Sequence, residues 1–312
     1  MRCIVTGGLG FIGRELVSAM RAEGHEVTAV DINQDNSGAS AGPVFQADVA
    51  QWSELVAALI HIKPEMVFHL GAMISTPAEA DPQRAFRVNV DGTFNLLELC
   101  RQFGVKTFVY SSTVAVYGRA VSSPVGDDAP QFPTTMYGAT KVACEQLGTY
   151  YHRKYDFDFR ALRLPTITGP TREAVGAGAF ATQLLLQPAL GNKYTVPIKS
   201  DTRVALLYVK DAVAALQQFS LVPSKSLQRR TYNIGGLAVT PGEMVAALLR
   251  VIPDASVDFK VDPNIDAIVS SWPILDQSNA EKDWGWRARY DIDSFASDFV
   301  AAARSNATKK EK

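Results

Sequence analysis

Tyr137 and Lys141 are the residues of this chain whose types and spacing first indicate a reaction. Side chains four positions apart on a helix lie on the same face, so the phenol and the ammonium would be neighbours. A phenol with its ordinary pKa of about 10 is a poor base at neutral pH, and a nearby ammonium lowers that pKa by favouring the phenolate. The pair could then remove a proton from an alcohol while a hydride leaves for an acceptor.

Hydroxyl side chains at 111–113 end the strand that the sequence predicts over 107–112. A hydroxyl at this position can reach a substrate oxygen beside the phenol, and Thr113 and Ser112 are both candidates. A surface Tyr/Lys pair is the simpler explanation of residues 137 and 141 when they are taken alone. The hydroxyl run on the preceding strand favours the catalytic interpretation.

Three glycines, Gly7, Gly10 and Gly13, occupy the turn between a predicted strand at 2–6 and a predicted helix at 11–23. A backbone without Cβ atoms can approach a diphosphate closely. The free N–H groups at the start of the helix attract its negative charge. The turn is therefore a candidate dinucleotide-binding motif.

An acidic residue ends the second predicted strand, at 25–31. A carboxylate about 20 residues beyond a glycine-rich turn accepts hydrogen bonds from an adenosine ribose in dinucleotide-binding folds. Asp31 would also repel a 2′-phosphate, and no Arg or Lys lies between Asp31 and Val49 to bind one. We therefore expect NAD rather than NADP.

Strands and helices alternate along the first 165 residues, which predicts an α/β fold of Rossmann type: a doubly wound parallel sheet with ligands at the carboxyl ends of its strands. The predicted strands lie at 2–6, 25–31, 66–70, 107–112, 159–164, 204–209, 231–234 and 257–261. The predicted helices lie at 11–23, 52–62, 83–103, 136–154, 211–219 and 241–251 and from about 292, with a frayed tail at 305–312. We predict an NAD-binding core over 1–165 with 203–234, and a smaller C-terminal substrate-binding lobe over 166–202 with 235–312.

Composition argues against several other functions. The net charge of −1 disfavours nucleic acid or an anionic membrane surface as the main partner. The apolar runs are too short to span a bilayer, and the first strand begins at Arg2 with no signal peptide before it. The three cysteines lack metal-ligand spacing and indicate buried thiols. We expect a cytoplasmic protein without a metal site.

Glycine turn, acid, hydroxyl and Tyr-x-x-x-Lys, in this order, resemble the extended short-chain dehydrogenase/reductases, the epimerase/dehydratase family, from Arg2 to about Tyr290. The resemblance implies Thr113, Tyr137 and Lys141 as catalytic residues, with Thr113 placed by the 114–118 stretch after it. Asp48 and Val49 would flank adenine, and Asn89 matches a structural Asn of the family. The cofactor-binding residues that the resemblance implies are Gly7, Gly10, Phe11, Ile12, Gly13, Asp31, Ile32, Asp48, Val49, Leu70, Gly71, Ala72, Asn89, Ser111, Tyr137, Lys141, Leu164 and Thr166.

Two subgroups of this superfamily compete. The stretches similar to D-erythronate dehydrogenases are 125–128, 162–167 and 268–273. Those similar to L-threonine 3-dehydrogenases are 201–203, 208–211 and 283–286, and both subgroups share Ser-Trp-Pro, found here at 271–273. Threonine enzymes carry Gly-Gly-Thr-Thr where residues 176–179 are Gly-Ala-Gly-Ala, without the two hydroxyls. Nucleotide-sugar epimerases usually carry Arg-Asp-Tyr/Phe where residues 203–205 are Arg-Val-Ala.

These features predict an NAD-dependent dehydrogenase that oxidises a secondary alcohol of a small hydroxy-carboxylate, such as a D-erythronate-like sugar acid. L-Threonine 3-dehydrogenase is one alternative, and a nucleotide-sugar epimerase with retained NAD is another. A non-enzymatic NAD sensor is a remote third, because Tyr137 and Lys141 are both intact. The substrate residues we expect are Ser75, Thr113, Arg172, Arg203 and Trp272, with the two arginines as candidates for binding a carboxylate.

The resemblance also implies a homodimer joined through helices at about 90–103 and 138–154. These helices carry more apolar side chains than one face of a sheet requires, although all of them could pack on that sheet. They are Leu96, Leu99, Phe103, Leu147, Tyr150 and Tyr151.

Overall fold

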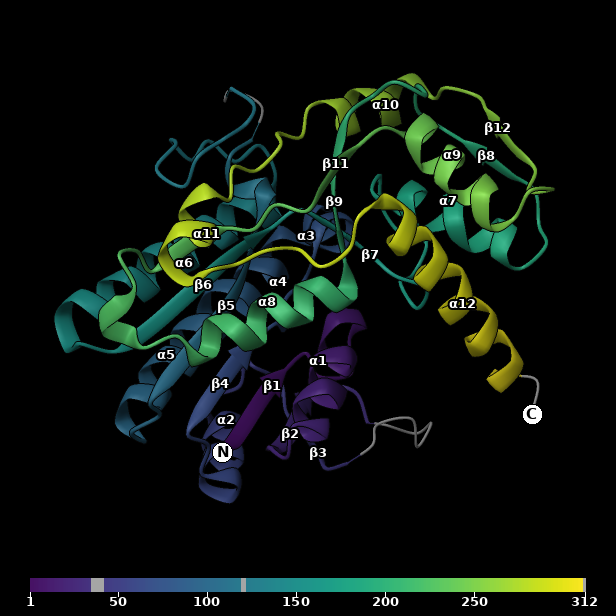
Figure 1. The fold of residues 1–312 in the computed structure, drawn as a ribbon. Helices are drawn as coiled ribbons and strands as arrows, with labels where there is room; N and C mark the ends of the chain where they lie inside the picture. Colours follow the sequence, from purple (N-terminus) through teal and green to yellow (C-terminus); the bar gives the residue numbers. More distant parts are fainter. Residues whose placement is uncertain (35–41, 119–121, 311–312) are drawn as a thin grey trace.

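The computed structural model describes residues 1–34, 42–118 and 122–310, and its centre is a seven-stranded parallel sheet (Figure 1). The strand order is β10-β6-β5-β4-β1-β2-β3, in which the chain starts centrally and winds outward in both directions. This confirms the predicted Rossmann-type α/β fold. The strands are β1 (Arg2–Thr6), β2 (Glu26–Asp31), β3 (Val44–Gln46), β4 (Met66–His69), β5 (Thr107–Thr113), β6 (Asp158–Leu164) and β10 (Thr231–Asn233).

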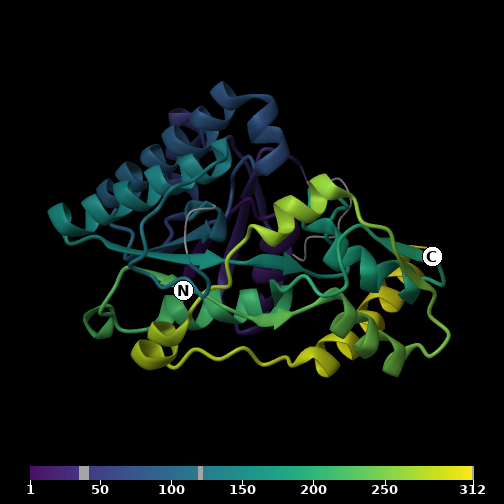
Figure 2. The same ribbon diagram turned by 90° about the horizontal axis from the view of Figure 1, so that it is seen from above.

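Helices cover both faces of this sheet, so its central strands are apolar nearly throughout, as buried parallel strands are. One face carries α1 (Phe11–Ala22) and α8 (Val209–Leu221). The other carries α2 (Trp52–Ile62), α5 (Gly92–Gln102) and α6 (Met136–Tyr155). Figure 2 shows the blue and teal helices α5 and α6 on one side of the sheet and green α8 on the other.

A second core is formed mainly by the C-terminal part of the chain. It holds a three-stranded sheet of order β11-β9-β7 and a two-stranded sheet of β12 and β8. Strand β9 pairs with β7 and β11, whereas β10 pairs with β6 of the large sheet. The division into two lobes stays a prediction. The elements are β7 (Thr166–Thr168), β8 (Tyr194–Val196), β9 (Val204–Tyr208), β11 (Leu237–Val239), β12 (Val257–Phe259), α7 (Ala179–Ala189), α9 (Pro241–Val251) and α12 (Ile292–Lys310).

The helix predicted over 83–103 is interrupted in the structure. It consists of α4 (Pro82–Phe86), a π-helical segment (Arg87–Asp91) and α5. The π turn surrounds Asn89, whose side-chain amide bonds to the backbone of Met73 through both its oxygen (2.7 Å) and its nitrogen (2.9 Å). Hydrophobic periodicity does not reveal such a tertiary contact.

The structure also differs from the predicted secondary structure in several connecting segments and at the C-terminal end of the chain. Three short helices were not predicted: α3 (Ser75–Ala80), α10 (Pro263–Ser270) and α11 (Ser278–Trp284). Each of them begins at proline or serine in a stretch too short to show a clear helical period. The predicted frayed tail is wrong as far as Lys310, since α12 continues to that residue. Parts of the predicted loops at 33–43 and 121–133 lie outside the described residues.

Helix α6 approaches the sheet closely because Gly148 has no side chain. A Cβ atom placed there would lie 2.2 Å from the ring of Phe159 in β6. We expect Gly148→Ala to lower the free energy of unfolding by about 1–3 kcal/mol, the usual effect of overpacking. Urea denaturation checks this, with Gly126→Ala as the control because a Cβ at Gly126 meets no atom within 4 Å. A Gly148→Ala protein as stable as wild type would contradict the close packing.

Candidate active site

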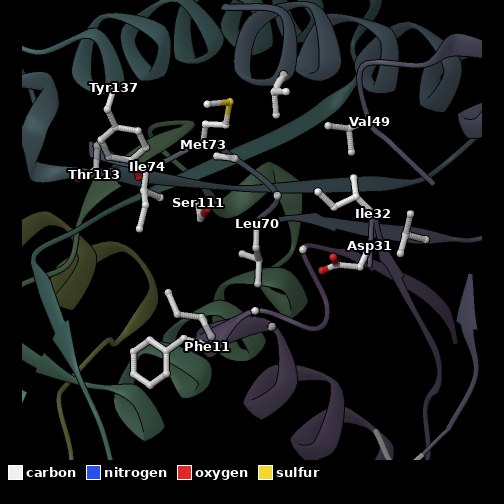
Figure 3. A pocket seen from close by; sticks show the side chains of 18 of the residues that line it. Phe11, Asp31, Ile32, Val49, Leu70, Met73, Ile74, Ser111, Thr113 and Tyr137 are labelled. Carbon is white, nitrogen blue, oxygen red and sulfur yellow. The ribbon is translucent and has the colours of Figure 1, made fainter. Parts of the chain in front are cut away.

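A cavity of about 470 Å³ lies across the carboxyl ends of the core strands (Figure 3). It extends from Asp31 at the end of β2 to Tyr137 at the start of α6, with Leu70 and Ser111 between them. Of the expected cofactor residues, those that line it are Gly7, Gly10, Phe11, Ile12, Gly13, Asp31, Ile32, Asp48, Val49, Leu70, Gly71, Ala72, Ser111, Tyr137 and Leu164. The structure therefore gathers in one cavity residues that are up to 157 positions apart, from Gly7 to Leu164.

The glycine turn fits a diphosphate. Gly7 has φ +65°, and a Cβ there would lie 2.9 Å from the backbone of Gly71. A Cβ on Gly13 would lie 2.1 Å from the Gly7 carbonyl oxygen, so Gly13 permits the close packing of α1 on the turn. Gly10 caps α1 without a side-chain hydrogen bond. The first N–H groups of this helix are thus available to an anion.

The Asp31 carboxylate lies beside the glycine turn and is held in place by backbone donors. Its Oδ2 accepts a hydrogen bond from the Leu9 N–H (3.1 Å), and its Oδ1 accepts one from the Asn33 N–H (3.1 Å). Carboxylate oxygens have further lone pairs for a ribose hydroxyl. Asp31 thus connects the glycine turn to the expected adenosine position.

Tyr137, Thr113 and Lys141 meet where β5 ends and α6 begins. Thr135 caps α6 by accepting a hydrogen bond from the Gly138 N–H (3.0 Å), which fixes the first turn. The phenol of Tyr137 lies beside the Thr113 side chain, close enough for Thr113 to lower the phenol pKa. Lys141 Nζ donates to the Ser111 carbonyl (2.6 Å) and lies 5.6 Å from the Tyr137 ring centroid. The phenol and the hydroxyl line the cavity, whereas Lys141 lies behind them.

The pKa of the phenol is shifted in the direction opposite to our expectation. Burial raises the pKa of Tyr137 to about 12, and the neighbouring Thr113 side chain only partly offsets that rise. Burial also lowers the pKa of Lys141 to about 8. In the free chain the phenol is therefore protonated at neutral pH. The expectation that the Lys141 ammonium lowers the phenol pKa is wrong for the free chain, because burial raises the pKa of Tyr137.

The structure separates the two candidate hydroxyls. The Ser112 hydroxyl donates to the buried carboxylate of Glu145, so it is engaged away from the Tyr137 phenol. Thr113 Oγ1 accepts a hydrogen bond from the Ala115 N–H (3.2 Å) and remains beside the phenol. Thr113 is therefore the better candidate for contact with a substrate oxygen.

The expected substrate residues are distributed more widely. A second cavity of about 400 Å³ lies between the residues after Thr113 and the end of α10, and Trp272 lines it. A Cβ placed on Gly178 would lie 3.3 Å from Arg172 Nη2 and 3.4 Å from the Trp272 ring, so these two side chains flank the same glycine. The lining of this second cavity is Val114, Ala115, Gly118, Thr134, Thr135, Ile268, Ser271, Trp272 and Pro273.

Several expected residues do not line either cavity. Arg203 bonds to the Ala238 carbonyl (2.6 Å) and to Glu243 (3.3 Å) on the surface beside β9. Ser75 begins α3, and Thr166 lies next to Gly178. Asn89 is buried behind the cavity wall, where it holds Met73. Tertiary packing decides whether each of these residues faces a cavity, and the neighbouring sequence does not indicate that packing.

Sequence reasoning also missed part of the cavity wall. Met73 and Ile74 directly follow Leu70–Ala72, which were predicted to bind the cofactor. The predicted cofactor-binding stretch therefore ended two residues too early. Arg84 and Val88 come from the interrupted helix, and no local pattern indicates which of its faces turns inward. The remaining missed lining residues are Val30, Asn33, Ala47, Pro165 and Ile167.

The described residues contain no group of three or more His, Cys, Asp or Glu side chains that could hold a metal ion. No helix among them is both long and apolar enough to cross a membrane. The site is thus a long cavity with a glycine turn at one end of its floor, a carboxylate beside it, and a Tyr–Thr–Lys group at the far end.

Residues 3–235 match the model of the NAD dependent epimerase/dehydratase family, and the chain belongs to this family. It is an NAD-dependent oxidoreductase of the extended short-chain dehydrogenase/reductase type.

Among its relatives, the mitochondrial L-threonine 3-dehydrogenase of Bos taurus is 33% identical over 297 residues, which cover 93% of this chain and 79% of the relative. A crystal structure of L-threonine dehydrogenase from Phytophthora infestans superposes with a TM-score of 0.91 at 32% identity, covering 99% of this chain and 100% of that one. The NAD complex of UDP-glucose 4-epimerase from Thermus thermophilus has a TM-score of 0.83 at 25% identity, covering 97% and 99%.

We expect Asp31→Ala to weaken NAD binding about 10- to 100-fold, the effect of losing hydrogen bonds to a charged acceptor. The same change should narrow the preference for NAD over NADP, since a 2′-phosphate would no longer face a carboxylate. Titration calorimetry with both cofactors measures this. Asp31→Asn keeps one acceptor oxygen but removes the charge. It therefore measures separately the repulsion between the carboxylate and the 2′-phosphate of NADP. Equal wild-type affinity for NAD and NADP would refute the role of Asp31.

Proposed function

We propose that this chain is an NAD-dependent dehydrogenase of a small carboxylate that bears a secondary alcohol, with L-threonine as the first candidate substrate. The observation that carries the proposal is the contact of Tyr137 with Thr113 at the cavity end where Lys141 is buried. This arrangement suits proton removal from an alcohol next to a hydride acceptor. The relatives named above support threonine rather than the D-erythronate-like substrate that we first expected.

Each catalytic residue has a distinct part in this proposal. The Thr113 hydroxyl orients the substrate alcohol towards Tyr137. Tyr137 first loses its own proton to solvent, and the resulting phenolate takes the proton of the alcohol as the hydride leaves. Oxidised NAD, when bound, supplies the hydride acceptor and a positive charge. Lys141 holds its ammonium near the phenol and stabilises the phenolate as it forms. Met73 and Ile74 line the cavity near this end.

Arg172 is the candidate for binding the substrate carboxylate. Its Nη1 donates to the Gly178 carbonyl (2.8 Å), and burial lowers the pKa of the guanidinium. Among the described residues no carboxylate lies within 4.0 Å of it. A desolvated guanidinium with free donors favours a carboxylate ligand. Trp272, on the same glycine, would cover that ligand from the other side.

A small hydroxy acid is the second candidate, and one observation favours it. The acidic side chains among the described residues that line the two cavities are Asp31 and Asp48, at the adenosine end. Neither is near Tyr137 to pair with the ammonium of an amino acid. A hydroxyl in place of that ammonium needs no such partner. Epimerisation of a nucleotide sugar with retained NAD is the remaining alternative.

A substrate panel tests the proposal. The wild-type protein with NAD would be offered L-threonine and four- to six-carbon hydroxy acids, including D-erythronate, while NADH is followed by absorbance. Sustained NADH formation with one of them is the expected result. Arg172→Gln should then raise KM for that acid strongly and leave the Kd for NAD nearly unchanged. Tightly held NAD with no net NADH from any small alcohol would instead support epimerisation.

We expect Tyr137→Phe to reduce turnover about 10²- to 10⁴-fold, the usual loss when a general base is removed. NAD affinity should stay close to wild type, because the phenol acts mainly on the alcohol. Thr113→Ser should be mild and Thr113→Val severe, since only the hydroxyl is required. Stopped-flow turnover and NAD titration measure the two effects separately. A Tyr137→Phe enzyme with more than about a tenth of wild-type turnover would rule out this base.

A homodimer through α5 and α6 stays a proposal, and the surface that supports it differs from the one expected. Leu96, Leu99 and Tyr151 are buried within the chain, because they pack on the sheet. Phe103 and Tyr150 are exposed. Three further exposed aromatic residues of α4, α5 and α6 are Phe86, Phe94 and Tyr155. Light scattering at micromolar concentration distinguishes a dimer from a monomer.

A further inference from the structure

A buried ion pair lies directly behind the proposed catalytic residues. Arg163 of β6 donates from Nη2 to Glu145 Oε2 (2.7 Å) and from Nε to Oε1 (3.0 Å). The two side chains are only 7% and 2% exposed. Burying a pair of charges seldom stabilises a fold more than apolar residues of similar size would. The burial of this pair therefore indicates that the charge of Glu145 acts on a neighbouring group.

One group that contacts Glu145 is a neighbour of Thr113. The Ser112 hydroxyl donates to Glu145, and Ser112 immediately precedes Thr113 at the end of β5. Glu145 thereby connects α6 to the strand end that presents the Thr113 hydroxyl. The amide of Gln131 also donates to Glu145 (2.7 Å), but Gln131 belongs to a loop and positions no catalytic residue.

Glu145 is also one helical turn beyond Lys141 on the same face of α6, a spacing that brings their side chains close together. The other groups around the Lys141 ammonium are Tyr110 of β5, with its ring centroid 4.4 Å away, Tyr137 and Cys144 of α6, and His69 of β4. Burial keeps these groups neutral at neutral pH, by raising the pKa of the phenols and the thiol and lowering the pKa of His69. Glu145 is the anion among them, and Arg163 faces it from β6.

We propose that Glu145 is a positioning residue for the dehydrogenase reaction, which acts on Thr113 through Ser112 and on Lys141 through its charge. This inference rests on the function proposed above. It assigns the ion pair a second purpose besides packing: Arg163 fixes the orientation of the carboxylate, and the carboxylate fixes two of the three catalytic groups.

The charge effect predicts a change in pH dependence. Glu145→Gln removes the anion one helical turn from Lys141, whose pKa burial has already lowered to about 8. The ammonium should then be lost at still lower pH, and the alkaline limb of the kcat/KM profile should move down by about one pH unit or more. A residue that served only packing would change the height of the profile without moving it. An unmoved alkaline limb in a folded Glu145→Gln enzyme would overturn the charge effect.

The contact through Ser112 is tested without disturbing the ion pair. Ser112→Ala should lower kcat about 10- to 100-fold, the range for a small misplacement of a catalytic group, with NAD affinity within about twofold of wild type. Gln131→Ala removes a hydrogen bond to the same carboxylate and serves as the matched control, with kcat near wild type. Equal losses in the two variants, or a loss in Ser112→Ala confined to NAD affinity, would overturn the positioning role.

A measurement without turnover separates this proposal from the proposed function. Lysine labelled with ¹³C at Cε allows the Lys141 titration to be followed by NMR in wild type and in Glu145→Gln, with Lys141→Met to assign the signal. A lower pKa of Lys141 in Glu145→Gln supports the charge effect even if no substrate in the panel reacts. An identical pKa of Lys141 in both proteins would contradict it, whatever the substrate.

Discussion

The burial of the Lys141 ammonium is the constraint on which the rest of the site depends. The side chain is only 1% exposed, and a charge removed from water is costly unless it is compensated. Compensation comes from the Ser111 carbonyl and the Tyr110 ring, which both belong to β5. Both contacts require α6 to lie tightly against β5, as the close approach at Gly148 also does.

Different strands of the sheet line the two ends of the cavity. The turn after β1 and the end of β2 supply the groups suited to diphosphate and ribose, within the first 31 residues. The end of β5 and the start of α6 supply the proposed reacting groups. Arg172 and Trp272 come from outside the large sheet. In the proposed function, substrate choice can therefore vary outside the large sheet without a change in the groups proposed for cofactor binding and chemistry.

Much of this arrangement was predictable from the sequence, because it depends on local patterns. The apolar strands, the glycine turn, Asp31 and the Tyr137–Lys141 spacing each have a signature within a few residues. Tertiary effects were not predictable. The pKa of Tyr137 rises because surrounding elements exclude water, and Arg203 is engaged by Glu243, 40 positions away. The Ser112–Glu145 contact likewise joins two elements whose separation in sequence gives no sign of it.

The π-helical segment around Asn89 has a consequence for how this chain tolerates changes in length. An α-helix turns by about 100° per residue, so the wider π turn rotates α4 relative to α5. Arg84 of α4 and Val88 of the π turn both line the cavity in this arrangement. Deleting one residue at 87–91 would restore a regular helix, swing both side chains away and release Met73 from Asn89. A gap of one residue in this helix between two members of the family would thus mark a different cofactor cavity, although no residue that touches substrate had been replaced.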